Sequence, residues 1–280
     1  MSVSLAVFLV LWIGLSAAGL NLTLQFLRVH GVEGVNYRHE RIPVGMGLFL
    51  WACVCLECWL AELWEAWNVP LPSWLTEPDL SYYFMLTVVF VAGWIDDTLG
   101  DPHVKGLKGH LRRFAREGVI TSGLAKAGMV SLAALWAAST IAASFWRGVL
   151  VFCVLVLTTN AVNLLDLRPA RALKGLFAAS LILMAVSLEL AAGYLLPVLA
   201  GGLLVFGYDL KAKAMLGDAG ANLLGFSLGY TAGLMLPDWG LLLWFTCTAV
   251  LHWIAERMSL SRIIERNRLL SWLDQAGRDG

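Results

Sequence analysis

The sequence predicts an all-α membrane protein, and its composition and its apolar runs lead to this fold class. Of the 280 residues, 59% are hydrophobic and only 14% are charged, well below the roughly 25% charge of soluble domains. Apolar runs of the length needed to cross a hydrocarbon core, roughly 20 residues, recur along the chain. The formal net charge is zero, which argues against a general nucleic-acid partner.

The apolar runs predict about nine transmembrane helices. They lie near residues 3–26, 43–66, 79–97, 122–143, 147–165, 174–190, 192–208, 218–236 and 239–258. No repeat or soluble segment interrupts them, so residues 1–258 are expected to form one transmembrane domain. Residues 259–280 mix leucine and isoleucine with arginine at helical spacing, which predicts an amphipathic surface helix at the C-terminus.

Basic residues predict how the chain is oriented in the membrane. Lys and Arg gather in alternate connections, near residues 28–41, 105–116, 168–174, 211–213 and 257–268, whereas the opposite connections are short or acidic. Because basic loops stay on the cytoplasmic side, the N-terminus is expected outside and the C-terminus inside. Nearly all the polar residues then face the cytoplasm.

An adjacent pair of carboxylates ends the third predicted helix. Asp96 and Asp97 follow the apolar run that starts at Ser81, at the end where the helix dipole is already negative. A solvated helix end is the simpler interpretation, but two close carboxylates at that position cost energy without a cationic partner. The pair therefore predicts a functional site that contains a cation.

Helix direction divides the other cytoplasmic residues into two groups. Asp166, like the aspartate pair, ends an inward-running helix, whereas Lys126, Lys174 and the turn at 217–220 begin outward-running ones, where free backbone NH groups attract anions. Carboxylates suit Mg²⁺, which binds through one or two of them plus substrate phosphate. Together the two groups predict phosphoryl chemistry at the membrane surface.

Each of these residues also has a structural alternative. Asp218 would equally serve as the N-cap of the eighth predicted helix. Asn160 and Asn163, one turn apart and on the face of Asp166, would also serve to bridge neighbouring helices. The simplest role for Arg38 and Arg41 is that of solvated positive-inside charges.

Three segments, taken in order, resemble the polyprenyl-phosphate N-acetylhexosamine-1-phosphate transferases, over about residues 1–258. Gly93 to Leu99 resembles the family's aspartate pair, Asn160 to Asp166 its Asn-Ala-x-Asn-x-x-Asp motif, and Leu216 to Gly220 its Met-Gly-Asp-x-Gly motif. The family transfers a sugar 1-phosphate from a uridine nucleotide to a lipid phosphate in the bacterial inner membrane, with Mg²⁺, and releases UMP. Such a reaction begins a cell-envelope glycan.

The resemblance implies a role for each matching residue. Asp96 or Asp97 would position or deprotonate the lipid phosphate, and Asp218 and Asn163 would hold Mg²⁺. The candidate substrate-binding residues are Lys126, Asn160, Asp166, Arg168, Arg171, Lys174, Arg38 and Arg41. The implied partners are a nucleotide-sugar donor, a polyprenyl phosphate acceptor and membrane lipid, with no nucleic acid; a homodimer is expected from the resemblance alone.

The sequence also departs from the family. Leu167 and Pro169 replace the usual residues after the Asn-x-x-Asp motif, and the late histidine-rich loop is missing; its region offers only His252, Glu256 and Arg257. A non-catalytic relative that binds lipid phosphate as a scaffold is the main alternative. A CDP-alcohol phosphotransferase is a third, but residues 173–189 lack the further aspartates which that family needs.

Overall fold

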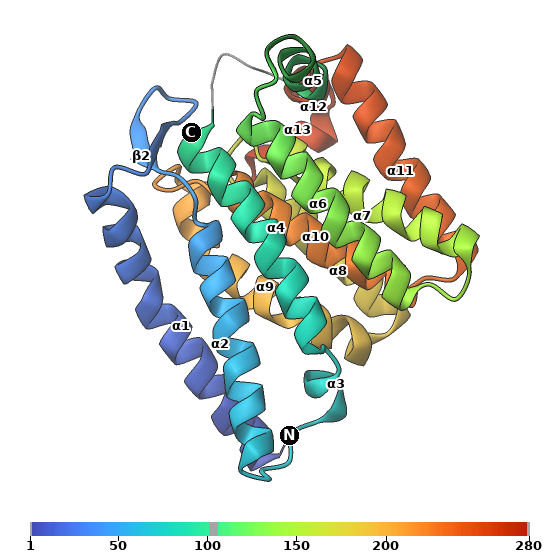
Figure 1. Ribbon diagram of the computed structural model, residues 1–280. Helices are drawn as coiled ribbons and strands as arrows, with labels where there is room; N and C mark the ends of the chain where they lie inside the picture. Colours follow the sequence, from blue (N-terminus) through green and yellow to red (C-terminus); the bar gives the residue numbers. More distant parts are fainter. Residues whose placement is uncertain (1, 101–105, 279–280) are drawn as a thin grey trace.

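The computed structural model describes residues 2–100 and 106–278 and is almost entirely helical (Figure 1). Seven of the described helices are long and apolar enough to cross a membrane, which confirms the predicted class. They are α1 (Val3–Val29), α2 (Gly47–Ala66), α4 (Leu80–Leu99), α6 (Ser122–Ile141), α7 (Phe145–Leu165), α9 (Leu188–Leu210) and α11 (Asp238–Arg257).

Two further helices complete the bundle at predicted positions. Helix α8 (Arg171–Val186) has 16 residues, fewer than the roughly 20 that a crossing needs. Helix α10 (Gly217–Met235) runs through the middle of the bundle, beside α7 and α4 (Figure 1). Every residue from Ala219 to Gly233 on α10 is buried, so α10 is the central element on which the other helices pack.

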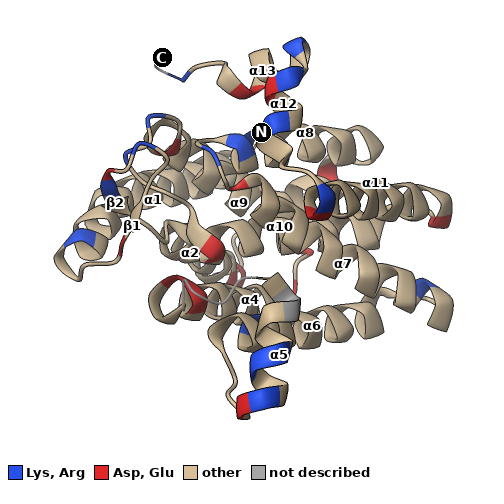
Figure 2. Cartoon of the chain, turned by 90° about the horizontal axis from the view of Figure 1, so that it is seen from above, with Lys and Arg blue, Asp and Glu red and all other residues tan. Residues whose placement is uncertain are grey.

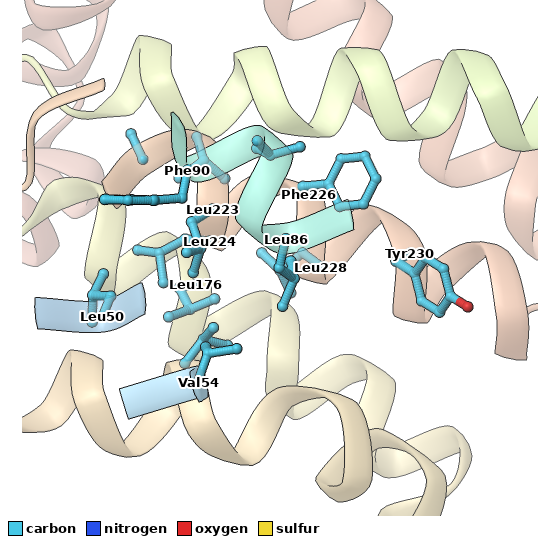
Figure 3. Close-up of a cluster of buried hydrophobic side chains, with 14 of the residues drawn as sticks. Leu50, Val54, Leu86, Phe90, Leu176, Leu223, Leu224, Phe226, Leu228 and Tyr230 are labelled. Atoms are coloured by element: carbon cyan, nitrogen blue, oxygen red, sulfur yellow. The ribbon is translucent and has the colours of Figure 1, made fainter. Parts of the chain in front are cut away.

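The hydrophobic core surrounds this central helix. Figure 3 shows Leu223, Leu224 and Phe226 of α10 among apolar side chains of α2, α4 and α8. Two glycines let the neighbouring backbones approach α10 closely. A Cβ atom at Gly47 would lie 2.2 Å from the backbone nitrogen of Gly220, and one at Gly93 would lie 2.5 Å from Cα of Ala219. The first turn of α10 is therefore fixed against α2 and α4.

The connections contain elements that the hydropathy pattern did not predict. A hairpin of β1 (Glu33–Val35) and β2 (Arg41–Pro43) pairs antiparallel before α2. The predicted start of the second span at residue 43 was therefore too early. Two short helices, α3 (Ser73–Thr76) and α5 (Gly106–Glu117), lie between the long ones. Residues 101–105, at the start of the second basic loop, lie outside the described residues.

The prediction of one amphipathic helix at the C-terminus was wrong. The tail forms two short helices, α12 (Leu260–Arg266) and α13 (Arg268–Gln275). Asn267 between them has an extended backbone, with φ −98° and ψ 117°, and its side chain accepts hydrogen bonds from the backbone NH groups of Leu269 and Leu270. Asn267 therefore acts as an N-cap, which begins a new helix and ends the old one.

Candidate functional site

Asp97 joins the end of α4 to the start of α10. Its carboxylate accepts hydrogen bonds from the backbone NH groups of Asp218, at 2.7 Å, and Ala219, at 2.9 Å. The positive end of the α10 dipole thus compensates the negative end of α4. Gly217 makes this contact possible, because its φ is +71° and a Cβ there would lie 2.6 Å from an Asp97 oxygen.

Lys126 is the cation that the aspartate pair required. Its ammonium group, on the second turn of α6, donates to Oδ2 of Asp96 at 2.5 Å and to Oδ2 of Asp218 at 2.7 Å. The three side chains are between 16% and 28% exposed, so water reaches the ion pairs. Four predicted site residues, Asp96, Asp97, Lys126 and Asp218, therefore meet in one group, called here the lysine cluster.

Asp166 lies beside the lysine cluster, just past the end of α7. Burial raises the pKa of Asp166 well above its usual value, and the nearby carboxylates of Asp209, Asp97 and Asp218 raise it further. A hydrogen bond from the backbone of Gly217 acts in the opposite direction. Asp166 and the lysine cluster together therefore contain four carboxylates and one ammonium group, that of Lys126.

Asp209 is a site residue that the sequence reasoning missed. It is 3% exposed on α9, and its carboxylate accepts a hydrogen bond of 3.0 Å from the backbone NH of Ala170, whose φ is +58°. An acidic residue inside an apolar run was the available signal, because such residues are expensive to bury.

A cavity of about 310 Å³ opens next to Asp166 and Asp209. The hairpin and the connections after α7 and α9 contribute its walls, which are formed by Val35, Asn36, Tyr37, Ile42, Asp166, Leu167, Arg168, Pro169, Asp209, Ala212 and Met215. Two guanidinium groups lie over the Tyr37 ring, that of Arg168 at 5.2 Å and that of Arg38 at 5.3 Å from its centroid. Cation–π attraction orients them. The side chain of Arg41, on β2, is exposed.

Two predicted phosphate ligands bind the C-terminal tail instead of lining this cavity. Arg171 donates to both carboxylate oxygens of Asp274, each at 2.9 Å. Lys174 donates to the carbonyl oxygens of Leu273, Asp274 and Ala276 at 2.8 to 2.9 Å. Arg278 also contacts Asp274, at 2.9 Å. We call Arg171, Lys174, Asp274 and Arg278 the tail clamp.

The two asparagines of the predicted motif have different surroundings. The Asn160 amide lies 2.7 Å from Nε2 of His252, which joins α7 to α11 in the way that the bridging alternative expected. Asn163 is half-buried, and within residues 2–100 and 106–278 its side chain makes no hydrogen bond.

The protein's own side chains supply only some of the ligands that a divalent cation needs. No group of three or more His, Cys, Asp or Glu residues within the described parts of the chain is placed to bind a metal. Oδ2 of Asp96 and Oδ2 of Asp218 are at most about 5 Å apart, because both contact the same nitrogen. Two oxygens bound to Mg²⁺ span up to about 4 Å, and Mg²⁺ needs only one or two carboxylates beside substrate phosphate and water. One Mg²⁺ would therefore contact both carboxylates only after Lys126 had moved aside and the two oxygens had approached each other to that distance.

Sequence comparison gives no further indication of the chemistry. The sequence matches no model of a known protein family and no curated protein. The functional interpretation therefore depends on the geometry of the lysine cluster and its cavity.

Proposed function

We propose that the protein transfers a sugar 1-phosphate from a nucleotide sugar, such as a UDP-sugar, to polyprenyl phosphate in a bacterial inner membrane. One observation carries this proposal. The three segments on which the family resemblance depends, 93–99, 160–166 and 216–220, end at one place, where Asp97 binds the backbone of α10 and Asp166 lies alongside. The nearest of these segments are about fifty residues apart in the sequence, so their meeting at one place supports a single site.

The proposed orientation places this site at the cytoplasmic face. Figure 2, a view of the molecule from above, shows Lys and Arg on the hairpin, on α5 and on α12. Basic residues favour the cytoplasmic side, and the carboxylates of the lysine cluster belong to the same end of the bundle. With α8 and α10 counted as spans, nine helices cross, the N-terminus is outside and the C-terminus is inside.

In the proposed reaction an oxygen of the lipid phosphate attacks the phosphorus that carries the sugar. A new phosphoanhydride bond forms, and the bond between this phosphorus and the nucleoside monophosphate breaks. The nucleoside monophosphate leaves with the electron pair of that bond. Lys126 turns from Asp96 and Asp218 to the transferred phosphate and neutralises its negative charge. Asp96, released by Lys126, accepts the proton of the acceptor phosphate. Phosphoryl transfer depends mainly on such positioning and charge neutralisation.

The remaining residues bind and orient in this scheme. Asp97 is a positioning residue, because backbone NH groups occupy both of its oxygens. Asp218 and Asn163 would hold Mg²⁺, which neutralises the charge of the diphosphate when it is bound. The cavity beside Asp166 would receive the nucleotide, with the Tyr37 ring and the Arg168 guanidinium as flat surfaces for the base.

The test is a UMP-release assay on the purified full-length protein in lipid, with undecaprenyl phosphate, Mg²⁺ and a panel of UDP-sugars. Asp96→Asn and Asp218→Asn are expected to lower turnover at least a hundredfold, about the effect of removing one electrostatic group from a catalytic site. Asp238→Asn is the matched control, since Asp238 is 80% exposed and pairs with Arg147 outside the site. Absence of UMP release with every donor, or full activity of both site variants, would refute the proposal.

A second candidate is a non-catalytic lipid-phosphate-binding protein that serves as a scaffold in envelope assembly. Lys126 favours it, because this side chain already satisfies Asp96 and Asp218 without a metal. Measurement of UMP release distinguishes the two candidates. The scaffold would bind undecaprenyl phosphate tightly and release no UMP with any donor.

A further inference from the structure

A second cavity, of about 180 Å³, lies where α11 meets α12 and shares no lining residue with the lysine cluster. Its walls are Arg257, Met258, Ser259, Arg262, Ile263 and Arg266. Three of these six residues are arginines and none is acidic. Within the described residues, none of the three guanidinium groups forms an ion pair with a carboxylate. We call this cavity the arginine pocket.

The fold brings these arginines together by specific contacts. Met258 has an extended backbone, with φ −139° and ψ 146°, which turns the chain between the two helices. The guanidinium of Arg257 lies 4.5 Å from the centroid of the Trp253 ring. On α12, Leu260 is buried, and the hydroxyl of Ser261 accepts a hydrogen bond of 3.2 Å from Arg171. The arginine pocket is therefore part of the folded structure.

The charge of the arginine pocket calls for an anion. Arg262 and Arg266 are one helical turn apart, and like charges at that spacing destabilise a helix. Guanidinium groups bind phosphate oxygens through paired hydrogen bonds, and the Ser259 side chain can donate another. A phosphate group matches this set of donors better than a carboxylate does, because it offers more acceptor oxygens.

The position of the arginine pocket indicates where the phosphate comes from. Helix α11 packs mainly on α7 and leaves an apolar face uncovered, with Val250 49% and Trp253 57% exposed. In a membrane this face contacts lipid, and tryptophan concentrates at the level of the headgroups. The bond between Asn160 and His252 places the end of α11 beside the end of α7, at the face where basic residues gather. The arginine pocket thus lies beside lipid phosphates.

We propose that the arginine pocket binds the phosphate of an anionic phospholipid in the leaflet next to the lysine cluster. This site is independent of the proposed transferase activity, because it shares no residue with the lysine cluster or its cavity. A bound headgroup would also hold α12, which contacts Arg171 of the tail clamp.

The experiment measures lipid binding by the full-length protein in detergent micelles, by native mass spectrometry. Phosphatidylglycerol is compared with phosphatidylcholine, with and without an equal concentration of inorganic phosphate. The variant Arg262→Gln with Arg266→Gln is set against a matched control, Arg112→Gln with Arg116→Gln. The control pair has the same spacing, is exposed on α5 and lies outside the arginine pocket.

The wild type and the control are expected to prefer phosphatidylglycerol, and the pocket variant to lose roughly fivefold in affinity for each arginine removed. Salt should weaken the binding, since it screens exposed charges. Equal losses in the two variants would mean attraction to charge in general, and an unchanged pocket variant would mean binding elsewhere; both overturn the proposal. If inorganic phosphate displaces the lipid at equal concentration, the pocket takes a soluble phosphate and the lipid assignment is wrong.

Discussion

The lysine cluster and the tail clamp both contain ion pairs shared among three side chains, but with opposite ratios of positive to negative groups. In the lysine cluster one ammonium group serves two carboxylates, Asp96 and Asp218. In the tail clamp one carboxylate, Asp274, serves two guanidinium groups. The lysine cluster is left with more carboxylates than ammonium groups, and the tail clamp with a surplus positive charge, which Lys174 increases.

The tail clamp is a complete set of contacts, whereas the lysine cluster still has carboxylates that can accept a further cation. All carboxylate oxygens of Asp274 are engaged, and Lys174 donates to three carbonyl oxygens. In the lysine cluster a single side chain, that of Lys126, supplies the whole positive charge. Basic residues next to a motif therefore need not be substrate ligands, as Arg171 illustrates.

Replacing the lysine should have the largest effect on this balance. Lys126→Met leaves Asp96 and Asp218 without their cationic partner. We expect a loss of about 2 to 3 kcal/mol in the free energy of unfolding, between the cost of breaking an exposed ion pair and that of breaking a buried one. Mg²⁺ should restore part of this loss in the variant and change the wild type less. Thermal unfolding in detergent, with and without Mg²⁺, measures both.

The matched control for this variant is Lys213→Met, which removes an exposed lysine outside the lysine cluster. If Lys126→Met were as stable as this control, the ion pairs of Lys126 would contribute nothing to the free energy of unfolding. If Mg²⁺ stabilised both variants equally, the two carboxylates would not be a cation site.

Removing the Asp97 carboxylate should have the next largest effect. Asp97→Ala leaves two NH groups of α10 without an acceptor, and the loss of a helix N-cap costs about 1 to 2 kcal/mol. Asp97→Asn should lose less, because its amide oxygen still accepts one of these hydrogen bonds. Chemical unfolding of the two variants gives the order. Equal losses would mean that the negative charge of Asp97 matters and its geometry does not.

Acid should open the tail clamp within a defined pH range. Hydrogen bonds from Arg171 and Arg278 outweigh burial, which acts in the opposite direction, and hold the pKa of Asp274 at about 2, below the ordinary 3.8. A lowered pKa means that the carboxylate stabilises the fold fully above about pH 4 and loses this effect as the pH falls through 2. The tail should therefore stay docked at pH 4 and open near pH 2.

Hydrogen exchange over α12 and α13, corrected for the intrinsic effect of pH, measures this opening. Asp274→Asn should exchange these helices severalfold faster already at pH 6, with little change in α10. A tail that is equally protected at pH 2 and pH 4 would contradict the role of Asp274.

The smallest loss of stability is expected for the hydrogen bond between Asn160 of α7 and His252 of α11. Asn160→Ala removes the hydrogen bond to His252, and side-chain hydrogen bonds between membrane helices contribute only about 0.6 kcal/mol. A double-mutant cycle with His252→Ala isolates this term. A coupling energy well above 1 kcal/mol would contradict the role of Asn160 as a simple bridge between helices.

Hydropathy and helix polarity were enough to predict a bundle of long apolar helices and the end of it at which these residues meet. Asp96, Asp97, Lys126 and Asp218 were correctly placed together, because each terminates or begins a helix at the same level. Their pairing was not predictable, since it depends on how far α10 approaches α4 past Gly93. The tail contacts of Arg171 and the role of Asp209 also depend on side chains distant in sequence, which periodicity does not report.

The anchoring of Asp97 by backbone NH groups has a consequence for speed. Its neighbours on α4 and α10 cannot shift without breaking that cap and the glycine contacts beneath it, whereas Lys126 is held only at the tip of a four-carbon chain. An exchange of partners by Lys126 then needs only rotation about the bonds of that side chain. A ligand that replaces Lys126 as the partner of Asp96 and Asp218 should therefore require no rearrangement of the helices.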